Sequence, residues 1–132
     1  MRAVLADAVA LYATADESDS LHQRAMEDFG RLQEDDRQVL VTYPTLLETH
    51  ALVLKRIGIA AAYLWMGYIA DADLVNPTAE DYRQAILRMR VFPDQDITLF
   101  DATVAAVAGR LGLEVWTYDH HFDIMRVPIW RG

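Results

Sequence analysis

Cysteine is absent from the sequence, so disulfides and thiolate metal ligands are excluded. The 6 glycines are scattered and form no phosphate-binding loop. The longest uncharged stretch runs from Ile57 to Ala70, which is shorter than the roughly 17–25 residues of a membrane-spanning helix. Asp7 interrupts the first apolar stretch, so the pattern of a secretory signal is missing too. We therefore expect no membrane association and a cytoplasmic location, which the lack of cysteine also suits.

Positive charge is scarce as well. The chain has 12 basic and 20 acidic residues, a net charge of −8, and Lys55 is its only lysine. Nucleic-acid binders usually carry a basic surface, because neutralising phosphates supplies most of their affinity. The remaining basic residues are arginines, whose planar guanidinium suits phosphate. The charge therefore predicts either a strongly basic partner or a substrate that is held partly through metal ions.

The 132 residues, of which 53% are hydrophobic, are enough for one domain spanning 1–132 with a real core. Apolar patterns predict strands at 4–6, 38–42, 73–75, 114–118 and 127–130, and helices at 7–14, 20–34, 44–58, 59–70, 79–91 and 98–111. This alternation predicts an α/β fold, a three-layer α/β/α sandwich with a central parallel sheet.

Four acidic residues occur where predicted strands pass into helices. Asp7 and Asp119 directly follow strands, whereas Glu48 and Asp101 lie one turn inside the helices that follow. In a parallel sheet all such junctions lie along the carboxyl edge, where ligand crevices form. The four carboxylates can therefore converge on one pocket, where their repulsion would be relieved by Mg²⁺ or Mn²⁺, hard cations that prefer oxygen ligands.

Each of these acids also has a simpler explanation. Asp7 can cap a helix, and Glu48 can complete a capping box with Thr45, as Asp101 can with Thr98. Zinc is not expected, because adjacent histidines such as 120 and 121 do not share a face of a helix or strand.

Four segments resemble the PIN-domain family, which includes the VapC-type toxins of bacterial toxin–antitoxin pairs. They are Val4–Asp7, Thr45–Leu52, Asp94–Ala102 and Thr117–Phe122, and the resemblance covers essentially the whole chain. The last two segments, in this order and spacing, are its most specific part. Two positions depart from the family pattern: Ala8 replaces a hydroxyl or amide residue, and His120 stands where many relatives have arginine.

The resemblance implies a Mg²⁺- or Mn²⁺-dependent endoribonuclease whose metal ligands and catalytic residues are Asp7, Glu48, Asp101 and Asp119. It further implies a set of outer residues that position these carboxylates or metal-bound waters. They are Asp94, Asp96, Thr98 and Thr117, although Thr98 can also be a plain helix cap. The implied partners are an RNA substrate, a cognate antitoxin that brings basic residues, and a second copy of the chain in a homodimer.

Two other functions stay open. One is a PIN module with little or no activity that binds a protein or RNA, which the altered Ala8 favours. The other is a phospho-receiver domain, which needs a lysine at a late strand end, whereas Lys55 lies within a predicted helix. The apolar helix at 59–70 is either buried on all sides or presents Trp65 or Tyr68 to a second subunit or an antitoxin.

Overall fold

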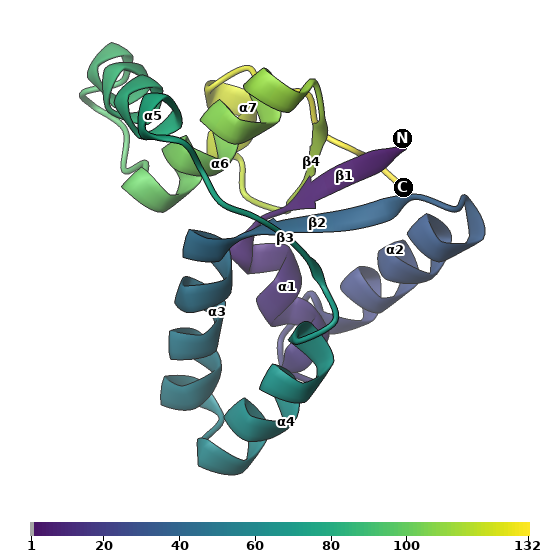
Figure 1. Cartoon of the computed structure of the whole chain (residues 1–132). Coiled ribbons are helices and arrows are strands. Elements are labelled where there is room, and N and C mark those ends of the chain that lie inside the picture. Colours follow the sequence, from purple (N-terminus) through teal and green to yellow (C-terminus); the bar gives the residue numbers. More distant parts are fainter. Residues whose placement is uncertain (1) are drawn as a thin grey trace.

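The computed structural model describes residues 2–132 and contains a four-stranded sheet in the order β3-β2-β1-β4 (Figure 1). The strands are β1 (Ala3–Ala6), β2 (Gln38–Thr42), β3 (Asp73–Val75) and β4 (Glu114–Trp116). All three neighbouring pairs are parallel, which confirms the predicted sheet. Because β1 is central, its carboxyl end lies between those of β2 and β4.

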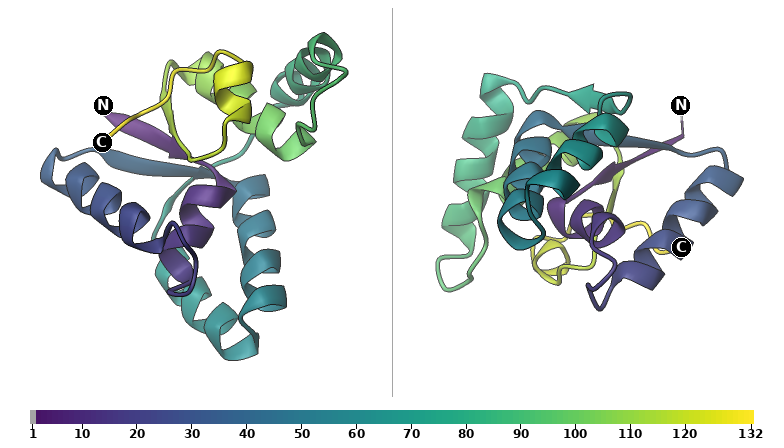
Figure 2. Two further views of the ribbon diagram at one scale, coloured as in Figure 1. Left: turned by 180° about the vertical axis from the view of Figure 1, so that it is seen from behind. Right: turned by 90° about the horizontal axis from the view of Figure 1, so that it is seen from below.

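Helices cover both faces of the sheet (Figures 1 and 2). On one face α1 (Ala8–Ala15) and α2 (His22–Glu34) pack against the strands, and α3 (Tyr43–Arg56) and α4 (Ile59–Ile69) extend beyond them. On the other face lie α6 (Leu99–Leu111) and the short α7 (His121–Ile124), while α5 (Ala79–Val91) packs on α6. Alternate residues of β1 serve the two cores, Leu5 one and Val4 the other. The predicted three-layer α/β/α architecture is confirmed.

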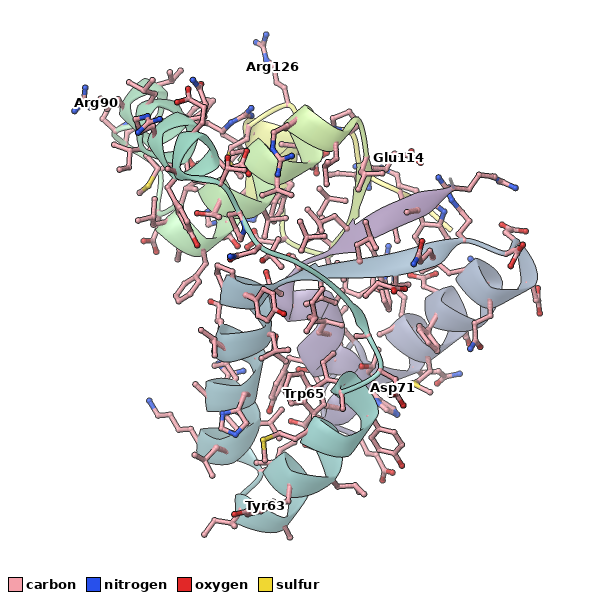
Figure 3. The ribbon with its side chains drawn as sticks, viewed as in Figure 1. Tyr63, Trp65, Asp71, Arg90, Glu114 and Arg126 are labelled. Atoms are coloured by element: carbon pink, nitrogen blue, oxygen red, sulfur yellow. The ribbon has the colours of Figure 1, made fainter. Side chains whose placement is uncertain are left out.

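The helical pair α3 and α4 turns at Gly58, whose φ of 128° lies in the region that favours glycine. Trp65 is buried with Tyr12 and Val53, and Figure 3 shows it turned toward the rest of the molecule. Tyr68, in contrast, is 75% exposed. The explanation that α4 is simply buried on all sides is therefore wrong.

The predicted last strand at 127–130 is also wrong. This segment makes a single parallel bridge between Val115 and Ile129, because Pro128 has no N–H to extend a ladder. The strand predicted at 114–118 ends at Trp116, since β1 ends at Ala6 and leaves it no partner beyond that point. Within residues 2–132 no helix is long and apolar enough to cross a membrane.

Candidate active site

Asp7 lies at the carboxyl end of β1 and caps α1. Its Oδ1 accepts a hydrogen bond from the backbone N–H of Ala10 at 2.9 Å, and its Oδ2 accepts one from the Thr117 hydroxyl at 2.5 Å. The side chain is almost fully buried. The simpler explanation of Asp7 as a helix cap is therefore correct, but the cap uses only one of its two oxygens.

Thr117 connects the ends of β1 and β4. While its hydroxyl donates to Asp7, it also accepts a hydrogen bond from the backbone N–H of Asp119 at 2.9 Å. One buried hydroxyl thus orients a carboxylate after one strand and the backbone of a second acid after the next. Among the predicted outer residues, Thr117 is the one whose hydroxyl contacts both the carboxylate of Asp7 and the backbone N–H of Asp119.

Asp101 reaches the same region from the first turn of α6. Its backbone N–H donates to the Thr98 hydroxyl at 3.1 Å, so Thr98 serves as the helix cap. Its Oδ2 lies 4.0 Å from Nδ1 of His121, and the same nitrogen lies 3.2 Å from Oδ1 of Asp119. Asp101 and Asp119 therefore flank His121, a residue to which the sequence analysis assigned no role.

Glu48 lies in α3, where the structure corrects its simpler explanation. The helix is capped by Thr42, whose hydroxyl accepts from the backbone N–H of Thr45. A capping box from Thr45 to Glu48 does not form, because α3 begins earlier than that box requires. Glu48 therefore has no capping role. Its side chain is partly buried, and the charge of Asp101 helps to raise its pKa.

The electrostatics of the four acids show that they lie close enough to affect one another. Burial, followed by the charges of Asp101 and Asp119, raises the pKa of Asp7 to about 7, although its hydrogen bonds oppose the shift. Burial and the charge of Asp101 raise the pKa of Glu48 to about 7. Burial and then Asp119 raise the pKa of Asp101. Among residues 2–132 no arginine or lysine forms an ion pair with any of the four, and the basic side chains that lie near them are those of His120 and His121.

This donor set fits a hard divalent cation, because it offers carboxylate oxygens and a charge that such an ion would neutralise. The acids do not, however, already meet at one point. Within the described residues, one group of three potential metal ligands has its ligand atoms within 4.8 Å of one another. Its members are Asp119, His120 and His121. The other predicted outer acids, Asp94 and Asp96, lie in an exposed loop, where no hydrogen bond or ion pair to the four acids is found within residues 2–132.

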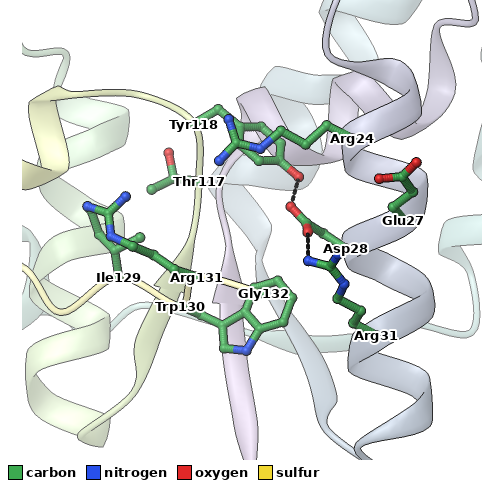
Figure 4. A pocket seen from close by; sticks show the side chains of 10 residues that line it. All are labelled: Arg24, Glu27, Asp28, Arg31, Thr117, Tyr118, Ile129, Trp130, Arg131 and Gly132. Carbon is green, nitrogen blue, oxygen red and sulfur yellow. Dashed lines mark hydrogen bonds and ion pairs between the residues drawn. The ribbon is translucent and has the colours of Figure 1, made fainter.

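An arginine-lined pocket lies beside this site, between α2 and the C-terminal segment (Figure 4). Its volume is about 280 Å³, and its lining includes Thr117 together with three arginines and two acids, Arg24, Arg31, Arg131, Glu27 and Asp28. The guanidinium carbon of Arg24 lies 4.8 Å from the centroid of the Tyr118 ring. The Tyr118 hydroxyl in turn donates a hydrogen bond to Asp28 at 2.7 Å. This pocket could not be predicted from the sequence, because Arg24 and Arg31 lie on α2 whereas Arg131 and Thr117 come from the far end of the chain.

The sequence matches no protein-family model and no curated protein, but solved structures share its fold over almost the whole chain. VapC20 of Mycobacterium tuberculosis, a toxin that cleaves the sarcin-ricin loop, is similar with a TM-score of 0.85 and 21% identity, covering 98% of this chain and 99% of that one. VapBC2 of Rickettsia felis, bound to a DNA fragment from its promoter, gives 0.76 and 10%, covering 98% and 97%. FitAcB of Neisseria gonorrhoeae gives 0.69 and 17%, covering 97% and 96%. The chain therefore has the PIN-like α/β fold that the resemblance in its sequence implied.

Proposed function

We propose that the protein is a Mg²⁺- or Mn²⁺-dependent endoribonuclease and the toxin of a toxin–antitoxin pair. The observation that carries the proposal is the grouping of Asp7, Glu48, Asp101 and Asp119 near the carboxyl edge of the sheet, where burial and the charges of Asp101 and Asp119 raise the pKa values of their neighbours. A nuclease of this class needs such a group of carboxylates to hold its cation. The likeness to VapC20, which cleaves RNA at the sarcin-ricin loop, supports this chemistry.

In this mechanism the four acids hold one or two divalent ions. When bound, such an ion activates water for attack on phosphorus and stabilises the charge that develops on the leaving oxygen. Thr117 keeps one oxygen of Asp7 engaged, so that this carboxylate has a fixed orientation. The backbone N–H of His121 does the same for Oδ1 of Asp119 at 2.9 Å. Cleavage by water in this way would leave a 3′-hydroxyl and a 5′-phosphate.

The arginine-lined pocket supports an RNA substrate in spite of the net charge of −8. It shares Thr117 with the acidic site, so an RNA strand with its scissile phosphate at the acids can place a neighbouring phosphate at Arg24, whereas Arg31 and Arg131 already pair with Asp28 and Asp123. Arginine binds phosphate through paired N–H donors. The charge of Arg24 would thus oppose, at this one point, the general repulsion between this chain and RNA.

The direct test is a cleavage assay on structured and unstructured RNA with Mg²⁺, Mn²⁺ or EDTA. We expect cleavage with either ion, loss of cleavage in EDTA, and recovery when Mn²⁺ is added in excess. The alternative is a PIN module that binds a protein or RNA without cutting it, which Ala8 favours. Tight RNA binding with no cleavage under any of these conditions would establish that alternative.

We further propose that α4 contributes to a protein interface, either between two copies of the chain or with an antitoxin. Leu64, Trp65 and Tyr68 line a hollow of about 930 Å³ together with residues of α1, α2 and β2. Exposed apolar surface of this kind is typical of interaction sites. VapBC2 is a complex of this fold type with a partner protein, which supports an antitoxin as one occupant.

Replacing Tyr68 with glutamate should convert a wild-type dimer into a folded monomer. Tyr68 is 75% exposed, so a charge there costs the isolated chain little, whereas burying that charge in an interface is expensive. Light scattering measures the mass, and circular dichroism verifies folding. Val91, which is 70% exposed at the end of α5, supplies the matched control: Val91→Glu should remain a dimer. A Tyr68→Glu protein that stays dimeric would place the dimer interface elsewhere.

A further inference from the structure

We propose that Asp119, His120 and His121 form a site for a transition-metal dication such as Zn²⁺ or Co²⁺, distinct in its chemistry from the carboxylate site. The three consecutive residues each offer one ligand atom, and these atoms all lie within 4.8 Å of one another. Two imidazole nitrogens and one carboxylate oxygen suit zinc, cobalt, nickel or copper, whereas magnesium prefers oxygen alone. A metal here would take two ligands from the residues before α7, Asp119 and His120, and one from His121, the first residue of that helix.

The distances match those of a metal site before any metal is added. Oδ1 of Asp119 lies 3.2 Å from Nδ1 of His121 and 3.7 Å from Nδ1 of His120. Two donors that are each about 2.1 Å from a tetrahedral Zn²⁺ lie about 3.4 Å apart. Small side-chain rotations would therefore suffice, and His120, which is exposed, has the freedom to make them.

His121 gives an independent reason for a ligand at this position. Its Nδ1 is buried, and within residues 2–132 it has no hydrogen-bond partner, although the Asp119 carboxylate is near. A buried polar atom without a partner costs free energy, roughly 1–3 kcal/mol. A metal ion bound to this nitrogen and to Asp119 would satisfy both groups, and Oδ2 of Asp101, at 4.0 Å, adds a second negative charge nearby.

The backbone explains why two adjacent histidines reach the same carboxylate. His120 precedes α7 with φ −63° and ψ −17°, and His121 is the first residue of that helix. The backbone N–H of His121 donates to Asp119 and closes a tight turn, and the two rings come within 4.5 Å between centroids. On a regular helix or strand adjacent side chains diverge, but this turn brings them together.

Asp119 belongs to this site and also to the carboxylate site, so the two metals compete for it. If the proposed function holds, Zn²⁺ bound at Asp119, His120 and His121 removes one ligand from the nuclease site and inhibits cleavage. The binding itself does not depend on the proposed function, because it requires only the three side chains. The two propositions can therefore be tested separately.

The test titrates the metal-free full chain with Co²⁺, follows the visible absorption of the bound ion, and displaces it with Zn²⁺. We expect His120→Gln and His121→Gln each to weaken Co²⁺ binding by more than the roughly 10- to 100-fold that loss of an outer-shell partner costs. His120 is exposed, so His120→Gln should fold normally even if His121→Gln does not. Glu34→Gln, at the end of α2, is the control and should bind Co²⁺ as the wild type does.

The same variants connect the site with cleavage. For each protein, the rate of RNA cleavage in Mg²⁺ with added Zn²⁺ is divided by its rate in Mg²⁺ alone. Zn²⁺ should lower this ratio strongly for the wild type and less for His120→Gln. Equal Co²⁺ affinity in the wild type and in both histidine variants would overturn the proposal. If no protein cleaves RNA but Co²⁺ binding still depends on the histidines, the proposed function fails and this site stands.

Discussion

Asp101→Asn should reduce divalent-dependent RNA cleavage by more than about 100-fold, beyond what loss of an outer-shell partner costs, while the protein stays folded. Asp101 is the acid whose charge acts on both Asp7 and Glu48, so its removal disturbs every part of the proposed metal site. Its contribution to the α6 cap is its backbone N–H, which asparagine keeps. Initial rates in saturating Mg²⁺ and Mn²⁺ give the effect, and circular dichroism reports folding.

The matched control is Glu34→Gln, which also removes one negative charge, but from the end of α2 and far along the chain from the acids. That variant should cleave at nearly the wild-type rate, which separates the role of Asp101 from a change in net charge. Wild-type turnover by Asp101→Asn would refute the assignment of the four acids. Loss of folding would instead mean that the Asp101 carboxylate is chiefly structural.

The architecture could be predicted from the sequence because its apolar pattern is local and regular. β2, β3 and α5 have the predicted bounds, and the sheet is parallel as expected. The position of Asp7 directly after β1 followed from the same pattern, since a strand that ends in an acid directs it to the carboxyl edge. Asp119, predicted directly after its strand, instead lies three residues beyond β4, which ends at Trp116. Where one strand or helix determines a position, the sequence is sufficient.

Two errors had a local cause, whereas two features were missed because a partner from elsewhere in the chain decides them. The strand at 127–130 needed a ladder that Pro128 cannot extend. The capping box at Glu48 needed α3 to begin near Thr45, but Thr42 already caps it. His121 could not be recognised from its spacing, because its environment is set by the turn into α7 and by Asp101 from α6. The arginine-lined pocket likewise exists only once α2 meets the C-terminal segment.

The metal-free protein should lose stability as pH rises from about 4 to about 8, because over this range the folded state holds protons that the unfolded state has already released. Burial and mutual repulsion raise the pKa of Asp7 from 3.8 to about 7 and that of Glu48 from 4.5 to about 7. The folded state therefore binds these protons more tightly than the unfolded state does. Their contribution to stability is complete below the unfolded pKa values near 4 and is lost as pH rises through about 7. A shift of one pKa unit corresponds to about 1.4 kcal/mol, so we expect a loss of a few kcal/mol, measured by urea unfolding in EDTA.

Millimolar Mn²⁺ should reverse this loss, because an ion that binds only the folded chain stabilises it by mass action and neutralises the ionised carboxylates. The rise in melting temperature with Mn²⁺ should thus be larger at pH 8 than at pH 5.5, where protons compete for the ligands. Asp7→Asn keeps an oxygen that can accept the hydrogen bond from Ala10 but removes one charge. That variant should be more stable than the wild type at pH 8 in EDTA, and it should gain less from Mn²⁺. A wild-type stability that stays flat across this pH range, or equal gains from Mn²⁺ in both proteins, would show that the acids do not share one site.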